Sequence, residues 1–123
     1  MKLADLADQE KQAFLDLLVL AMYADGHLAS AEDERIVKVL TAFGFESEYD
    51  RGKQLDASVT RARQRAETRD AARHYAASLA ETFTSPDTKQ AVFNALAELV
   101  AADSRVSPEE RSFLGVIREV LAV

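Results

Sequence analysis

The stretch that decides the fold is Ala101-Ala102-Asp103-Ser104-Arg105-Val106-Ser107-Pro108-Glu109-Glu110-Arg111, near the end of the chain. An apolar helical pattern runs into it from Pro86, and a second one leaves it toward Leu121. Within it, Ser107-Pro108-Glu109-Glu110 is a capping box, in which a serine and the glutamate three residues later satisfy the free amides of a helix start. The stretch therefore predicts the end of one helix, a short acidic turn and the start of another helix.

The chain contains this unit twice. The earlier copy reads Tyr23-Ala24-Asp25-Gly26-His27-Leu28-Ala29-Ser30-Ala31-Glu32-Asp33-Glu34-Arg35, in which Ser30 to Asp33 resembles a second capping box. The two helix–turn–helix units span residues of about 9–44 and 86–122. Two copies are too few for a solenoid. We expect a pseudo-symmetric bundle around two central apolar helices.

The rest of the chain is also helical in pattern, and sustained strand alternation is absent. The first helix should begin after Asp5 or Asp8, with either aspartate as its cap. Residues 47–66 predict a helix with a candidate break at 56–58, and residues 68–83 predict another. Gly44 supplies a left-handed stop for the helix that follows the first turn. Together these patterns predict an all-α, single-domain bundle of about six helices covering residues 1–123.

Composition limits the class of protein. With 123 residues the chain is long enough to bury a core without metal or disulfide, and it has no cysteine. Its longest apolar run, residues 17–24, is too short to span a membrane, and the N-terminus lacks signal-peptide features. We therefore expect a cytoplasmic protein without membrane insertion. The net charge of -6 argues against nucleic acid as a partner.

The two aspartates at the helix ends, Asp25 and Asp103, need an explanation. An acid at a helix C-terminus opposes the helix dipole at a cost of a few tenths of a kcal/mol. One explanation is structural, with each aspartate bonding its own turn and the following acids capping the next helix. The other is a cation, because carboxylates and carbonyls around a short turn suit calcium or magnesium rather than zinc. The acids that could complete such a site are Glu32, Asp33 and Glu34 in the first copy and Glu109 and Glu110 in the second, and the residues alone leave both explanations open.

Residues 24–28 with the acids at 32–34, and the stretch from Ala102 to Arg111, resemble the signature of TerB-like tellurite-resistance domains. The same signature is similar to the N-terminal region of a membrane-anchored DnaJ-type co-chaperone. The resemblance implies an all-α domain linked to tellurite and other chemical stress, with other proteins of such a system as partners. It also implies a divalent-metal site formed by these acids: Asp25, Asp103, Glu110 and either Glu32 or Asp33.

Two further features are a stripe of arginines outside the turns and a histidine in the first turn. Arginines recur every four residues at Arg61, Arg65, Arg69 and Arg73, a stripe that could meet phosphate or an acidic partner. The alternative is a solvated face with weak ion pairs. His27 is a lone candidate ligand in the first turn.

No nucleophile–base set, glycine-rich phosphate loop or paired histidine motif is present, so we do not expect an enzyme. The sequence thus predicts a non-enzymatic, TerB-like domain that binds a divalent cation. The alternative is a helical protein-interaction module, scaffold or co-chaperone-like, whose acidic turns are only capped helix ends.

Overall fold

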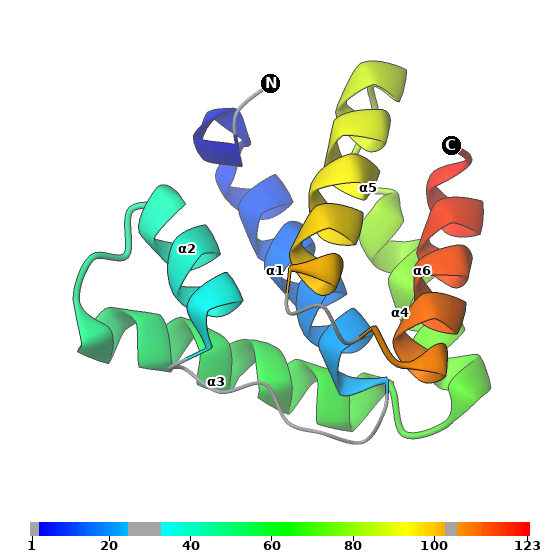
Figure 1. The fold of residues 1–123 in the computed structure, drawn as a ribbon, viewed down its shortest axis with the longest axis horizontal. Coiled ribbons are helices and arrows are strands. Elements are labelled where there is room, and N and C mark those ends of the chain that lie inside the picture. The colour runs from blue at the N-terminus through cyan, green and yellow to red at the C-terminus, as the bar shows by residue number, and fades with distance from the viewer. Residues whose placement is uncertain (1–2, 25–32, 103–105) are drawn as a thin grey trace.

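The computed structural model describes residues 3–24, 33–102 and 106–123, and they form one short 3-10 helix and six α-helices without a strand (Figure 1). In chain order these are η1 (Leu3–Asp5), α1 (Asp8–Tyr23), α2 (Glu34–Ala42), α3 (Glu48–Arg65), α4 (Arg69–Ala80), α5 (Pro86–Ala101) and α6 (Pro108–Leu121). The predicted all-α bundle is confirmed. No helix of the described ranges has the length and apolar character needed to cross a membrane.

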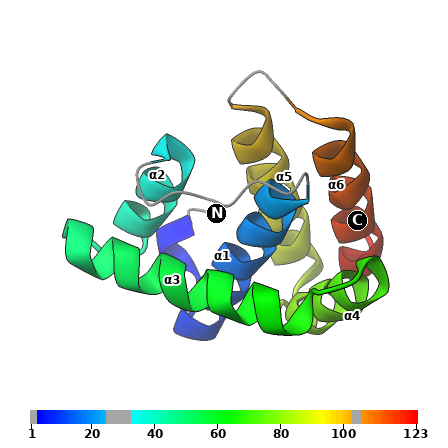
Figure 2. The same cartoon turned by 90° about the horizontal axis from the view of Figure 1, so that it is seen from below.

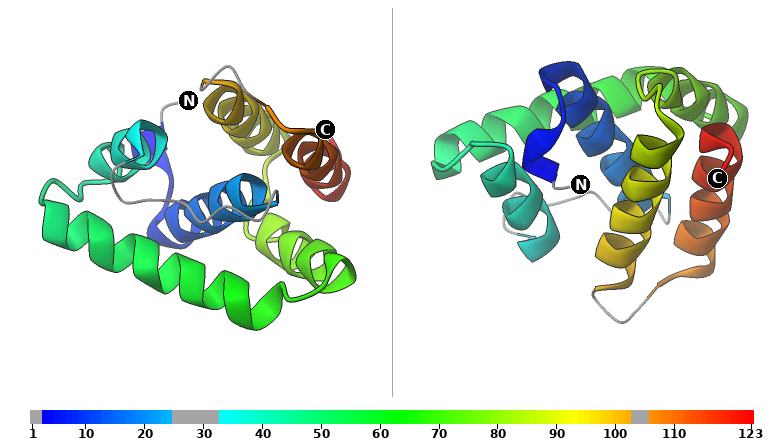
Figure 3. Two further views of the ribbon diagram at one scale, coloured as in Figure 1. Left: turned by 60° about the horizontal axis from the view of Figure 1, so that its bottom comes forward. Right: turned by 90° about the horizontal axis from the view of Figure 1, so that it is seen from above.

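Helix α1 is the centre of the bundle. Its ten consecutive residues from Ala13 to Met22 are all buried, as expected of a helix that is apolar on every side. Helices α3, α4, α5 and α6 pack around it (Figure 3). Helix α5 is less central than expected. It buries Val92, Leu96, Leu99 and Val100, whereas its other apolar residues are half-buried or exposed.

Several helix ends follow the sequence rules. Ser47, Thr68, Ser85 and Ser107 each cap a helix by accepting a backbone N–H. Gly44 has φ of 99°, and the Phe45 N–H donates to the Leu40 carbonyl at 2.9 Å. This left-handed stop is the one predicted after the first helical unit.

Three helix boundaries or breaks differ from expectation. The N-cap of α1 is Ala7, whose N–H donates to the Glu10 carboxylate at 2.9 Å, so the predicted aspartate cap is wrong. Helix α2 starts at Glu34 with Asp33 as its cap, later than a Ser30 cap would allow; Ser30 lies outside the described residues. Helix α3 runs unbroken through residues 56–58, because the Ser58 hydroxyl donates to a buried partner and does not compete for the helix backbone.

The two sequence units pack differently. Helix α6 lies against α5, α1 and α4, whereas the main backbone neighbours of α2 are α3 and η1. Figure 2 shows α2 and α6 at opposite sides of the molecule, with the long α3 running below α1. The C-terminal ends of α1 and α5 and the start of α6 lie toward the same end of the bundle (Figure 1). The described flanks of both acidic turns therefore face one end.

Candidate functional site

Asp33 is tied to the start of α2. Its Oδ1 accepts the Arg35 N–H at 2.9 Å and the Arg35 Nε–H at 3.0 Å, and its Oδ2 accepts from a terminal guanidinium nitrogen at 2.9 Å. The hydrogen bonds from Arg35 lower the pKa of Asp33, although partial burial acts in the opposite sense. Because both oxygens are engaged, capping and one ion pair account for this residue.

Glu110 belongs to the predicted capping box, which is confirmed. The Glu110 N–H donates to the Ser107 hydroxyl at 3.0 Å, and the Ser107 N–H donates to Glu110 Oε1 at 3.3 Å. The side chain is buried, with 6% of the residue exposed. The cap uses Oε1, and the Glu110 carboxylate forms no other hydrogen bond with the described residues.

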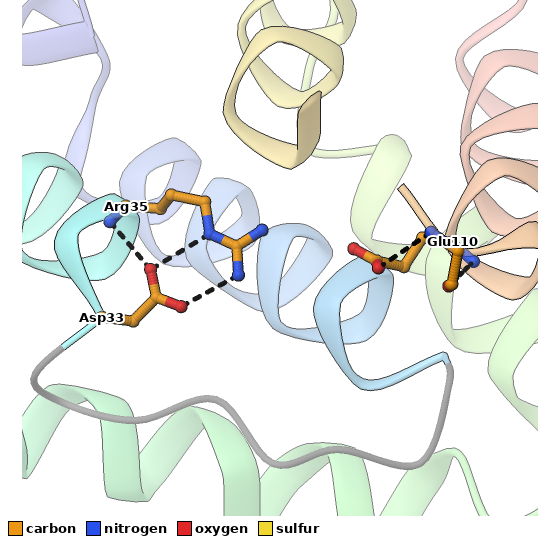
Figure 4. Close-up of polar contacts among 4 residues, drawn as sticks. Asp33, Arg35 and Glu110 are labelled. Atoms are coloured by element: carbon orange, nitrogen blue, oxygen red, sulfur yellow. Dashed lines mark hydrogen bonds and ion pairs between the residues drawn. The ribbon is translucent and has the colours of Figure 1, made fainter. Parts of the chain in front are cut away.

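The two acids of the predicted metal site that the structure describes do not meet. Figure 4 shows Asp33 beside α2 and Glu110 at the start of α6, with the ribbon of α1 between them. Within residues 3–24, 33–102 and 106–123, no group of three histidine or acidic side chains is placed to hold a metal ion. The remaining predicted ligands, Asp25, Glu32 and Asp103, and the candidate His27, lie outside the described residues.

Within the arginine stripe, the side chains have different environments. Arg61 turns inward and forms a two-point ion pair with Asp16, with both nitrogen–oxygen distances at 2.9 Å. The Arg65 guanidinium lies over the Tyr75 ring, 4.5 Å from its centroid. These two arginines make contacts within the bundle, and Arg61 is only partly available to a partner.

The other two arginines of the stripe lie on α4. Arg69 is exposed, at the first position of the helix. Arg73 forms an exposed ion pair with Glu119 of α6 at 2.6 Å, with 51% of its side chain accessible. Thr68 separates α3 from α4, so the four arginines do not share one continuous helix.

A buried polar cluster around Asp16 was not predicted. Asp16 is 2% exposed, and its carboxylate accepts from the Ser58 hydroxyl at 2.6 Å, from Arg61 twice, and from the Tyr75 hydroxyl at 2.9 Å. Burial and the charge of Asp16 raise the pKa of Tyr75 to about 12, and the hydrogen bond to Asp16 raises the pKa of Arg61. With four hydrogen bonds to two oxygens, the carboxylate joins α1, α3 and α4 and has no room for a ligand.

A signal for this cluster was present in the sequence. Asp16 is the one charged residue inside the apolar run from Ala13 to Met22. A buried carboxylate requires a partner, because burying an unpaired charge costs more free energy than the packing of one helix can supply. That argument predicts a basic or hydroxyl partner, although it does not say which.

The family of the chain follows from a comparison of its sequence with known families. A family model described as tellurite resistance protein TerB matches residues 11–123, nearly the whole chain and both acidic turns. The chain belongs to the TerB family. The resemblance read from the two turns is thereby confirmed. Comparisons of this TerB-family chain with curated proteins and with solved structures found no match.

This TerB-family domain also has a groove between α2 and α5, with a cavity volume of about 670 Å³. One wall is the first turn of α2 and the other is the last two turns of α5, and Leu3 of η1 lines the groove as well. Its apolar lining residues are Leu3, Ala95, Leu99 and Ala102. Its charged lining residues are Asp33, Glu34, Arg35, Lys38 and Glu98. The volume falls in the range of ligand and peptide clefts.

Proposed function

We propose that this TerB-family domain binds a divalent cation, calcium or magnesium rather than zinc, through its acidic turns. It acts without catalysis in a cytoplasmic response to tellurite or related chemical stress, alongside other proteins of that system. The observation that carries the proposal is the family match, which spans both turns. In each turn the sequence has an aspartate directly after an apolar helical stretch, where a helix dipole disfavours an acid unless a cation offsets it.

The hydrogen bonds of the described acids support a ranking of the proposed ligands. Both oxygens of Asp33 serve the α2 cap and its arginine, so this residue is a secondary candidate at most. Glu110 uses only Oε1 for its cap, which leaves Oε2 as an oxygen for a cation. An acid after a helix C-terminus is disfavoured by the helix dipole unless a cation offsets it, so Asp25 and Asp103 are proposed as the principal ligands, with Glu32 in support. The ends of α1 and α5 lie toward one end of the bundle, which favours neighbouring turns (Figure 1).

The test is calorimetric titration of the metal-free domain with calcium, magnesium, manganese and zinc. We expect Asp103→Asn and Asp25→Asn each to weaken calcium or magnesium binding by about tenfold or more, because the number of carboxylate ligands sets the affinity of such sites. Asp56→Asn, an exposed change in the middle of α3, is the matched control and should leave binding unchanged. Equal binding by Asp103→Asn and wild type would show that the turns are capped helix ends only.

A further inference from the structure

We propose that the groove between α2 and α5 binds a short, basic amphipathic helix of a partner protein. This inference is independent of the cation proposal, since it uses only described residues of the two helices and η1. The groove volume of about 670 Å³ suits a few large apolar side chains from one face of a helix.

The floor of the groove is formed by apolar side chains, two of which are small. Leu99 forms its buried part, and Leu3 lines it from η1. Ala95 of α5 and Ala102, the C-cap of that helix, lie one turn to either side of Leu99, and their small side chains leave room for a ligand. Residues spaced three and four apart form one stripe of a helix, so the stripe matches the leucine stripe of an incoming helix.

The charges at the groove select a basic partner. Glu34 on α2 and Glu98 on α5 are exposed, and neither forms an ion pair with a described residue. Glu98 lies in the last turn of α5, where the negative end of the helix dipole adds to its charge, whereas Glu34 lies at the positive end of the α2 dipole and contributes its carboxylate alone. Arg35 forms an ion pair with Asp33. Lys38 lies one turn farther along α2 and is the cation at the other end of the groove. A partner helix with bases at one end therefore finds its counterparts.

The backbone chemistry favours a helix over an extended peptide. An extended segment needs a sheet edge with open N–H and C=O groups to pair with. The walls of the groove are the first turn of α2 and the last turns of α5, and the described residues contain no strand whose edge an extended peptide could join. A ligand that satisfies its own backbone and presents one apolar face is the one these walls can accommodate.

The probe is a synthetic amphipathic peptide of about 14 residues, or about four helical turns, with leucines on one face and lysines flanking that face at one end. A second peptide carries glutamate at each lysine position. Fluorescence anisotropy in a chelator-containing buffer compares them, so that bound metal plays no part. We expect saturable binding of the basic peptide and none of the acidic one. Amide chemical shifts should change along residues 33–38 and 95–102.

Three variants locate the binding. Glu98→Lys should weaken binding of the basic peptide by about fivefold or more, as expected for reversing an exposed charge. Ala95→Trp, which gives the chain its only tryptophan, should abolish binding by filling the groove. Glu81→Lys makes the same charge change at the end of α4, outside the groove, and should leave affinity unchanged. Thermal melts establish that each variant is folded.

Several results would overturn the proposal. One is the absence of saturable binding by the basic peptide at concentrations up to about 1 mM, the weak end of specific affinity. Others are equal weakening by Glu98→Lys and Glu81→Lys, or shifts confined to α3 and α4, which would place the contact at the arginine stripe. Self-association blocked by Ala95→Trp, without peptide binding, would instead identify a second copy of the chain as the occupant.

Discussion

At the scale of single residues, Asp16 is the group on which most polar contacts of the interior converge. Asp16→Ala leaves the partners in α3 and α4 without their acceptor, and removing one member of a buried pair costs about 3–5 kcal/mol. We expect about 3 kcal/mol, the low end, because the Arg61 side chain is 30% exposed and can turn to water. Urea denaturation measures the loss. Asp56→Ala on the exposed face of α3 is the control, and equal stability of the two variants would contradict the assignment.

Tyr75 gives the cluster a signature at high pH. Burial, with a smaller contribution from the charge of Asp16, raises the pKa of Tyr75 to about 12 from an ordinary value near 10. Because the folded state favours the neutral phenol, the stability it contributes is complete below about pH 10 and is lost as the pH rises toward 12. Ultraviolet titration should show a late tyrosine ionisation that Tyr75→Phe removes. An unchanged titration curve in that variant would be inconsistent with the buried hydrogen bond.

Asp33 governs a response at low pH. Its pKa is lowered, mainly by the side-chain hydrogen bonds of Arg35, so its contribution is present above the unfolded value of about 3.9 and is lost as the pH falls through the folded value. Asp33→Asn keeps an N-cap but loses the ion pair, and should flatten the decline in stability below about pH 4 while costing under about 1 kcal/mol at pH 7. Thermal melts across acid pH test this, and an unchanged acid profile would count against the pair.

At the scale of elements, Gly44 and Gly52 have different roles, one in a turn and the other inside a helix. Gly52 lies inside α3 with nothing within 4 Å of an added Cβ, so Gly52→Ala should stabilise the fold by about 0.5–1 kcal/mol. Gly44, with φ of 99°, ends α2 in a conformation that alanine resists, so Gly44→Ala should destabilise it by about 1 kcal/mol or more. The melting temperatures of the two variants test this prediction. Shifts of the same sign in both would contradict it.

The element boundaries were predictable where one side chain sets them. Ser107 with Glu110, Thr68 and Gly44 each fix a helix end through local bonds that the sequence displays. The start of α1 was missed because Ala7 has no capping side chain and the glutamate three residues later satisfies its amide alone. The unbroken α3 was missed for another reason, since the role of Ser58 depends on a partner 42 positions away.

At the scale of the whole molecule, periodicity revealed buried faces but not their neighbours. Asp16 meets Ser58, Arg61 and Tyr75 across separations of 42 to 59 positions, which helical spacing cannot encode. The same limit applies to the duplicated unit. Its two copies share a sequence pattern, yet α6 packs on α1, α4 and α5 while α2 lies beside α3 and η1. That departure from pseudo-symmetry produces the groove between α2 and α5, which no sequence motif indicated.

The acidic turns are the feature of the whole molecule for which capping is the least complete explanation. Their described flanks lie toward one end of the bundle, and the TerB family match includes both. Asp33 and Glu110 have structural roles, so the cation proposal depends on the aspartates at the two helix ends, Asp25 and Asp103. A cation shared between them would couple the first and second halves of the chain.

The most direct test of this claim is an amide NMR titration with calcium and magnesium, on wild type and on Asp103→Ala. We expect shifts confined to residues 24–34 and 102–111 that saturate with metal and disappear in the variant. A titration that stays silent up to about 10 mM metal, beyond the weakest usual affinity of about 1 mM for such sites, would contradict it.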